Sequence, residues 1–367
     1  MKAEELERAL REAEPPDAGP ARERARRTVL AAHEQARSRR RVRRIAPLVY
    51  AAIAVVLATL VVTQRDSGPV QAVERRVREI VNDPKPTPTP AAPLPASGRL
   101  LVSGADGLAV VSGGRTTKLG TYDDATWSPR GLFVGATDGR ALVALNPANG
   151  ALRWRLVPGG TVSLPRWAPN GLHIAYRAGG GLRIVYGNGE HDVLAGRRMA
   201  AVAPAWRPTT PRTVAWTNTN GTVTVEDADT AKVLRSYRSA GVRHLAWSRD
   251  GRKLLIAGRR NGTIRDYVTG TRTRLALEGD LLAAAYGPRG LALAVQRGAR
   301  TEIRLRGTVL FSAVGRLDDL EFSPDGQWLL AGDATSGQWL LARAAGQASV
   351  AAVRRLGSAA RTHGWCC

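Results

Sequence analysis

The sequence predicts an all-β fold, a seven-bladed β-propeller, for residues 98–367. Three observations support this prediction. An aromatic residue followed by a Pro-x-Gly turn or a related turn recurs six times, the aromatic residues lie 36–41 residues apart, and short apolar runs separated by Asp-Gly and Asn-Gly turns fill the intervals. A period near 40 residues with several strands in each repeat is typical of propeller blades.

The aromatic residues of this repeat, which we call the blade anchors, are expected to end the innermost strand of each blade. The turn after each anchor then leads into the second strand, and the Asp-Gly or Asn-Gly turns join the remaining strands as hairpins. We expect the anchors to be core residues. The seven blade anchors are Trp127, Trp167, Trp206, Trp247, Tyr286, Phe322 and Trp365.

The number of blades depends on the two ends of residues 98–367. The first six anchors indicate six blades. However, residues 99–119 contain three strand-like runs with no anchor strand before them, and residues 359–366 reach Trp365 with no blade after it. Joining the two ends gives one more complete blade, and such closure removes exposed sheet edges. We therefore predict seven blades, and a six-bladed ring is the alternative.

The repeats resemble those of known propeller families. The Trp-Ser-Pro-Arg-Gly segment at 127–131, with the apolar strand after it, resembles the TolB-type repeat. Residues 244–270 resemble a WD repeat, although Asp266 and Tyr267 stand near the place of its Trp-Asp pair, and residues 144–154 are similar to quinoprotein propeller repeats. The layout as a whole resembles membrane-anchored propellers of GC-rich Gram-positive bacteria. These resemblances imply the fold, but they do not select one function because propellers host many activities.

A stretch without charged residues, at 45–62, precedes the propeller. As a helix it would be about 27 Å long, close to the hydrocarbon thickness of a bilayer. We predict a transmembrane helix at residues 45–63, with a cleaved signal peptide as the alternative. Six Arg residues crowd positions 37–44, so we expect residues 1–44, an Arg-rich helical tail, to be cytoplasmic and the propeller to be extracytoplasmic.

Two further segments connect the apolar stretch to the propeller. In residues 64–83, Val70, Val73, Val77 and Ile80 fall at helical spacing with charged residues between them, which indicates an amphipathic juxtamembrane segment or a simple spacer. Residues 84–97 form a Pro-rich linker, which favours extended polyproline II structure and would hold the propeller away from the membrane.

Residues with catalytic or metal-binding chemistry are few and scattered. His173, His191, His244 and His363 lack the spacing of a metal site, and no Gly-x-Ser-x-Gly motif occurs. We therefore predict no catalytic residue, no cofactor and no metal ion. The pairs at 123–124 and 318–319, both Asp-Asp, each precede an anchor by three or four residues, and this recurrence favours a structural loop role.

The last two residues, Cys366 and Cys367, are the only cysteines of the chain. Three interpretations stay open from the sequence. The pair forms a vicinal disulfide, it forms a bridge to another molecule, or it merely ends the closing strand.

The chain is strongly basic, with a formal charge of +23, and residues 98–367 carry +17 from 36 basic and 19 acidic residues. A GC-rich genome is the simpler explanation, since Arg outnumbers Lys by 49 to 5, but a basic surface also attracts polyanions. The sequence predicts a membrane-anchored, non-enzymatic binding or scaffold module for a protein, an anionic wall polymer or a ligand, and nucleic acid is not the expected partner. The alternatives are a transmembrane signal transducer with a regulatory tail and a propeller enzyme of quinoprotein or lactonase type.

Overall fold

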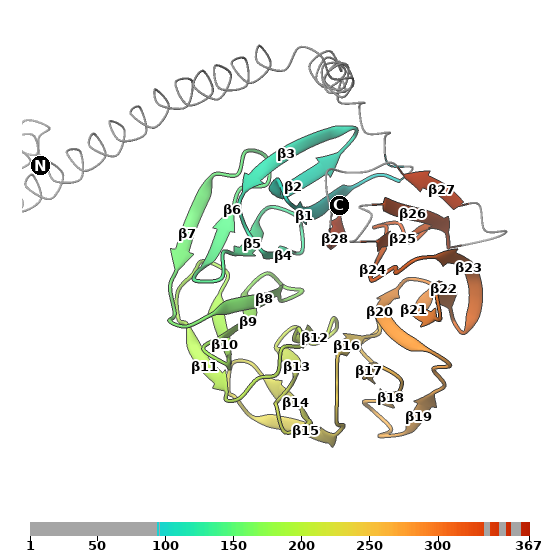
Figure 1. Cartoon of the computed structure of the whole chain (residues 1–367). Helices are drawn as coiled ribbons and strands as arrows, with labels where there is room; N and C mark the ends of the chain where they lie inside the picture. Colours follow the sequence, from blue (N-terminus) through green and yellow to red (C-terminus); the bar gives the residue numbers. More distant parts are fainter. Residues whose placement is uncertain (1–93, 95, 334–337, 345–349, 354–360) are drawn as a thin grey trace, which may run out of the picture. The chain divides into compact units, whose positions relative to one another are not determined.

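Each period of the sequence forms one four-stranded antiparallel sheet, and the sheets are arranged as a ring around a central axis (Figure 1). The computed structural model describes residues 94, 96–333, 338–344, 350–353 and 361–367. Seven such sheets are present in this part of the chain. The all-β, seven-bladed propeller is therefore confirmed, and the six-bladed alternative is wrong.

Several predicted segments lie outside the described residues. They are the helical tail at 1–44, the transmembrane helix at 45–63, the juxtamembrane segment at 64–83 and most of the Pro-rich linker at 84–97. Within the described ranges, no helix combines the length and the apolar character that a membrane span requires. The four predictions for residues 1–93 therefore stay predictions.

We number the blades from the one that contains β1, and give the strands of each from the innermost to the outermost. Blade 1 contains β28 (Arg361–Cys366), β1 (Arg99–Gly104), β2 (Gly107–Ser112) and β3 (Arg115–Gly120), and blade 2 contains β4 (Asp124–Trp127), β5 (Val134–Thr137), β6 (Leu142–Leu145) and β7 (Leu152–Leu156). Blade 3 contains β8 (Val162–Trp167), β9 (His173–Ala178), β10 (Gly181–Tyr186) and β11 (Val193–Gly196), and blade 4 contains β12 (Ala205–Trp206), β13 (Thr213–Thr217), β14 (Thr222–Asp227) and β15 (Val233–Arg238). Blade 5 contains β16 (His244–Trp247), β17 (Lys253–Ala257), β18 (Gly262–Asp266) and β19 (Arg272–Leu275), and blade 6 contains β20 (Asp280–Gly287), β21 (Gly290–Arg297), β22 (Arg300–Leu305) and β23 (Thr308–Val314). Blade 7 contains β24 (Asp319–Phe322), β25 (Trp328–Asp333), β26 (Gln338–Arg343) and β27 (Val350–Val353).

Blade 1 is built from both ends of the described chain. Its innermost strand β28 pairs antiparallel with β1, from Arg99 opposite Cys366 to Ser103 opposite Arg361, with a bulge after Leu101. In Figure 1 the C-terminus lies beside β1, inside the ring. Blade 1 thus closes the ring in the way that the two incomplete ends of the sequence indicated.

The turn after each anchor explains why the motif recurs. In blade 2 the Ser128 hydroxyl accepts the backbone N–H of Phe133 at 2.9 Å, and Gly131 donates its own N–H to the Ser128 carbonyl at 2.8 Å. Gly131 has a φ of 62°, a conformation that residues with a side chain rarely adopt. The serines at 248 and 323 accept the equivalent N–H bond in blades 5 and 7. Ser and Gly thus stabilise the turn in these three blades, whereas blade 3 forms the same backbone turn with Ala168 and Gly171.

The core lies between neighbouring blades rather than inside single blades. One cluster joins Leu142 and Ala144 of blade 2 to Trp167 and Tyr176 of blade 3. Because strand side chains alternate between the two faces of a sheet, each blade contributes one face to the cluster on either side. A blade therefore depends on both neighbours for burial of its apolar side chains.

Candidate functional site

The blade anchors all lie at the end of an innermost strand. Five of them are the last residue of the strand, whereas Tyr286 and Trp365 are the last but one. Trp127 and Tyr286 are half-buried, and the other five are 5–8% exposed. The anchors thus occupy structural positions between blades, and the structure does not gather them into a binding site.

Three indole groups also fasten one blade to the next. Trp127 donates its Nε1–H to the carbonyl of Gly364 on β28 at 3.1 Å. Trp247 donates in the same way to Ala205 of β12 at 3.1 Å, and Trp206 donates to a carbonyl of β8 at 2.8 Å. Each acceptor is on the innermost strand of the preceding blade, so these bonds fix the angle between neighbouring blades.

The acidic pairs make a matching set of contacts at the other end of the innermost strands. The Asp124 carboxylate accepts the backbone N–H of Leu164 on β8 at 3.0 Å, and the Asp319 carboxylate accepts that of Thr362 on β28 at 2.7 Å. In both cases the donor belongs to the next blade. The preceding aspartate of each pair donates its own N–H to the second strand of its blade, at 2.8 and 2.9 Å. The recurring pairs therefore connect strands and blades.

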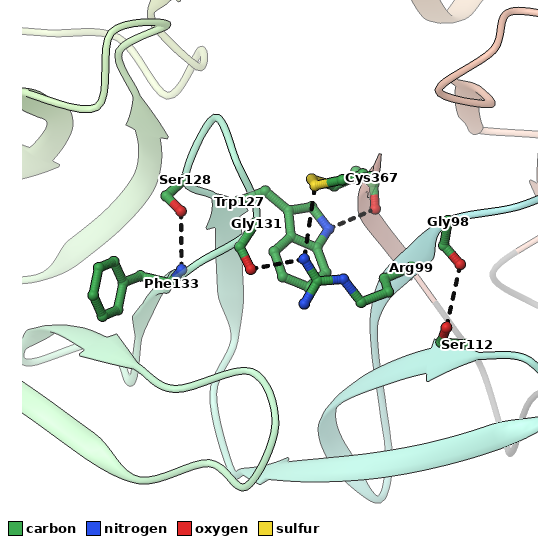
Figure 2. Close-up of a disulfide and its surroundings, with 10 residues drawn as sticks. Gly98, Arg99, Ser112, Trp127, Ser128, Gly131, Phe133 and Cys367 are labelled. Carbon is green, nitrogen blue, oxygen red and sulfur yellow. Dashed lines mark hydrogen bonds between the residues drawn. A yellow bond between two sulfur atoms is a disulfide. The ribbon is translucent and has the colours of Figure 1, made fainter.

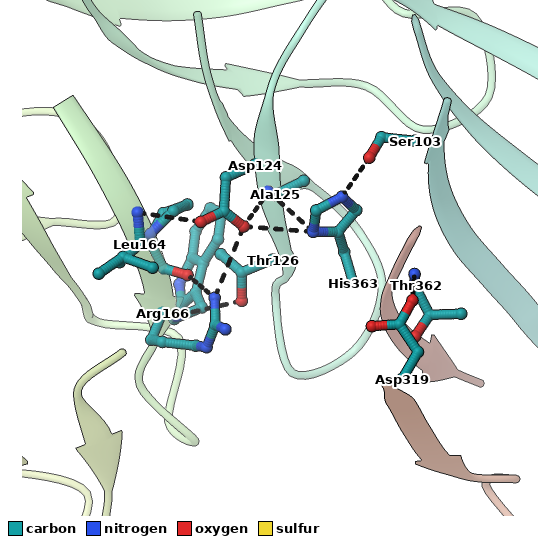
Figure 3. A network of polar contacts seen from close by, with 11 residues as sticks. Ser103, Asp124, Ala125, Thr126, Leu164, Arg166, Asp319, Thr362 and His363 are labelled. Carbon is teal, nitrogen blue, oxygen red and sulfur yellow. Dashed lines mark hydrogen bonds and ion pairs between the residues drawn. The ribbon is translucent and has the colours of Figure 1, made fainter. Parts of the chain in front are cut away.

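A polar network surrounds Asp124 where blades 1, 2 and 3 meet (Figure 3). His363 Nδ1 lies 3.2 Å from one carboxylate oxygen of Asp124, and His363 Nε2 lies 2.7 Å from the hydroxyl of Ser103. Ala125 donates its N–H to the same carboxylate oxygen at 2.8 Å, and the guanidinium of Arg166 is 3.9 Å away. Burial opposes the charge of Asp124, but the hydrogen bond from His363 and the attraction of Arg166 outweigh it and lower its pKa.

This network has the order of groups found in Ser-His-Asp hydrolases, yet its surroundings differ. The His363 side chain is only 4% exposed. The Asp124 carboxylate is already committed to backbone N–H groups of β4 and β8 as well as to the imidazole. A catalytic triad also needs donors placed for a developing oxyanion and room for a substrate. We therefore interpret the network as the closure contact of three blades.

Two further carboxyl groups lie on β24, close to this network. Burial raises the pKa of Asp319 to about 6, and the neighbouring Asp318 acts in the same direction. Burial, together with Asp319, raises the pKa of Glu321 to about 7. The two side chains share one face of the strand because they are two residues apart. These groups therefore gain charge near neutral pH, unlike surface carboxyl groups.

The cysteine pair forms a disulfide between Cys366 and Cys367 at the end of β28 (Figure 2). The guanidinium of Arg99 contacts it, with Nη2 3.7 Å from Cys367 Sγ, and donates to the Gly131 carbonyl at 2.8 Å. The same guanidinium stacks over the ring of Trp127, 5.0 Å from its centroid. The disulfide is thus part of the packing between blades 1 and 2.

A pocket of about 590 Å³ lies on the face of the ring where the innermost strands begin. Its lining comes from the loop before β12, the start of β16, the turn between β17 and β18, the start of β20, the end of β21 and the loop before β24. Blades 4, 5 and 6 therefore contribute most of it. The innermost strands surround the central axis (Figure 1). Because the lining includes the starts of the innermost strands β16 and β20, the pocket lies beside that axis. Clefts of this size are typical of ligand sites.

The pocket is cationic. Its charged residues are Arg243, Arg259, Arg316 and Asp280. Arg259 pairs with Asp280 at 2.6 Å, and Arg260, outside the lining, also pairs with Asp280 at 2.6 Å. The lining also contains His244, whose pKa is lowered by burial, so that its ring is neutral at pH 7.

His173 and His191, the other two histidines of the propeller, do not lie together in a site. His173 is buried in blade 3, where it packs against Tyr186 and Trp206 and its Nε2 lies 3.3 Å from Asp229. His191 is exposed. Among the residues that the structure describes, no group of three His, Cys, Asp or Glu side chains could hold a metal ion.

The comparisons with known proteins agree with this architecture. The family model described as WD domain, G-beta repeat, matches residues 230–265, which run from the outermost strand of blade 4 to the third strand of blade 5. Together with the seven blades, this match makes the fold a WD-repeat-like β-propeller. Comparison with curated proteins gives no match.

Two solved structures are similar to the chain. One is a putative 6-phosphogluconolactonase from Bacteroides uniformis, 14% identical, with a TM-score of 0.54 over 73% of this chain and 100% of that chain. The other is a Kuenenia stuttgartiensis hydrazine synthase, 14% identical, with a TM-score of 0.49 over 62% of this chain and 78% of that chain. At such identity the likeness to the first concerns the fold alone.

Proposed function

We propose that this chain is a single-pass membrane protein whose propeller is an extracytoplasmic, non-enzymatic binding module for a partner protein. The observation that carries the binding role is the pocket beside the central axis, built from loops of blades 4 to 6. A closed ring of blades supports such a site because its loops are presented by a rigid scaffold. The WD-repeat-like match favours protein binding over other roles.

The membrane part of the proposal rests on the sequence alone. The uncharged stretch at 45–62 has the length of a membrane span, and the Arg cluster at 37–44 favours a cytoplasmic N-terminus. Protease added to intact cells should then digest the propeller and spare the tail at 1–44. Complete protection of the propeller in intact cells, with digestion after lysis, would exclude this orientation.

The binding role is tested by cross-linking in intact cells followed by capture of the full-length chain in detergent. We expect one protein to be enriched reproducibly, and we expect its recovery to fall when the pocket is blocked by Leu282→Trp, a substitution at a half-buried lining residue. The control is Leu132→Trp, at an exposed leucine in the turn after the blade 2 anchor. Enrichment of an anionic envelope polymer instead of a protein would favour the other predicted partner. The absence of any enriched molecule would contradict the binding role.

A further inference from the structure

The charges of the pocket are unbalanced. Three arginines and one aspartate are among its lining residues, and the lining histidine is neutral. Asp280 is shared by two arginines, and Arg316 pairs with Asp318 at 3.2 Å. Arg243 is exposed, and its guanidinium has no hydrogen-bond or ion-pair partner among the described residues, although its backbone N–H donates to the Ala257 carbonyl at 2.8 Å. The lining therefore has two positive charges more than negative ones, and at least one guanidinium is free to bind an anion.

The rest of the lining is suited to an organic ligand. Ala201 is exposed, and Ala200 and Leu282 are half-buried, so these three residues form apolar surface next to the arginines. The side-chain amide of Gln296 has no hydrogen-bond partner in the described part of the chain. Such an amide carries both donors and an acceptor, which matches the N–H and C=O groups of a peptide.

We infer that this pocket binds a short peptide segment of the partner protein that carries two acidic side chains next to apolar ones. This inference rests on the proposed function and specifies the chemistry of the same site. Arg243 would bind one carboxylate through its planar fork of donors, and Arg259, which shares Asp280 with Arg260, would bind the second. The apolar surface would contact the neighbouring aliphatic side chains, and Gln296 would bond the peptide backbone.

An anionic sugar or phosphate polymer fits the pocket less well. Such a polymer would bind the arginines, but it presents polar groups along its whole length and gains little from contact with the apolar residues Ala201 and Leu282. A phosphate group also has acceptor atoms only, so it would leave the acceptor oxygen of the Gln296 amide without a partner. The mixed lining therefore favours the acidic peptide.

The test measures binding of a fluorescent peptide to the full-length chain in detergent. The probe has the sequence Ala-Leu-Glu-Ala-Glu-Leu-Ala with blocked ends, and the comparison probe has Lys in place of both Glu residues. We expect the acidic probe to bind and the basic probe not to bind. Arg243→Ala should weaken binding of the acidic probe about 10-fold to 100-fold, because it removes a charge-assisted bond.

Two controls isolate the effect of the pocket. Arg249→Ala removes an exposed arginine of the same blade, in the turn after the anchor, and should leave affinity unchanged. Arg243→Glu should abolish binding of the acidic probe and allow binding of the basic one. Melting temperatures should be unchanged for all three variants, since the side chains of Arg243 and Arg249 are exposed and have no polar partners among the described residues.

Three results would overturn the inference. The first is no binding of the acidic probe, the second is equal loss of affinity in Arg243→Ala and Arg249→Ala, and the third is binding of polyphosphate that the acidic probe cannot displace. Each of these leaves the proposed function standing if cross-linking still enriches one partner protein. If no partner is enriched while the acidic probe binds as described, the proposed function fails and the chemistry of the pocket stands.

Discussion

Deletion of the closing strand, residues 361–367, tests whether the seventh blade holds the ring together. The strand pairs with β1 at five positions, and its Trp365 is 8% exposed in a cluster with Leu100, Val111 and Trp339. Loss of a buried Trp side chain costs about 3–5 kcal/mol. Each ladder hydrogen bond contributes about 0.5–1.5 kcal/mol net. With about one such bond at each paired position, the deletion should cost about 6–12 kcal/mol, which is comparable to the whole stability of an ordinary domain.

The assay is thermal and denaturant unfolding of the full-length chain in detergent, combined with size-exclusion chromatography. We expect the truncated chain to melt far below the wild type and to aggregate, because β1 becomes an exposed edge. Deletion of residues 1–36, which precede the propeller in the sequence, is the matched control and should not change melting. If the chain that ends at residue 360 melts like the wild type and stays monodisperse, the closing role of β28 is refuted.

Three further predictions concern single sites. Trp167→Ala and Trp247→Ala should each lower the free energy of unfolding by about 3–5 kcal/mol in denaturant titrations, and losses under about 1 kcal/mol at both would contradict their core role. Burial raises the pKa of Glu226 to about 7, so the folded state keeps a proton that the unfolded chain loses near pH 4. The free energy of unfolding should therefore fall by up to about 3 kcal/mol as pH rises from about 4.5 to 8. In melting series at different pH values, Glu226→Gln should reduce this pH dependence. Equal pH dependence in the variant and the wild type would contradict the role of Glu226. Replacement of both Cys366 and Cys367 by Ser should change the free energy of unfolding by less than about 1 kcal/mol, because a link between adjacent residues closes almost no loop. If an alkylating reagent modifies Cys366 or Cys367 of the wild type without reductant, the two thiols are free and the disulfide is disproved.

The blade repeat could be predicted because its cause is local in the sequence. In blades 2, 5 and 7 a Ser that accepts a backbone N–H and a Gly with positive φ lie within five residues of the anchor, so the turn leaves the same short signal in these blades. The signal is weakest after Trp206, where Gly is missing, and there the innermost strand β12 is only two residues long. Closure of the ring could be predicted because the repeats begin with three strands that lack an innermost strand and end with one innermost strand that lacks a blade, so the two ends complete each other.

The polar network and the pocket could not be predicted in the same way. The His363 ring contacts Ser103, which is 260 residues away in the sequence, and Ala125, which is 238 residues away. Arg243 is one of 49 arginines, and nothing near it in the sequence distinguishes it. Its role depends on loops of three blades that come together only when the ring is closed. Such long-range juxtapositions leave no short pattern, because each residue is constrained by a partner in another blade.

The C-terminal position of β28 also has a consequence for the timing of folding. The strand that pairs with β1 is synthesised more than 250 residues after its partner. At about 5–20 residues per second, β1 waits roughly 13–50 s for that partner. During this interval the edge of β1 that pairs with β28 has no hydrogen-bonding partner, and Leu100 lacks its contact with Trp365, while the other blades can already fold. Blade 1 is therefore where the growing chain is most exposed to wrong pairing, and a factor that binds β1 during this interval would raise the yield of folded protein.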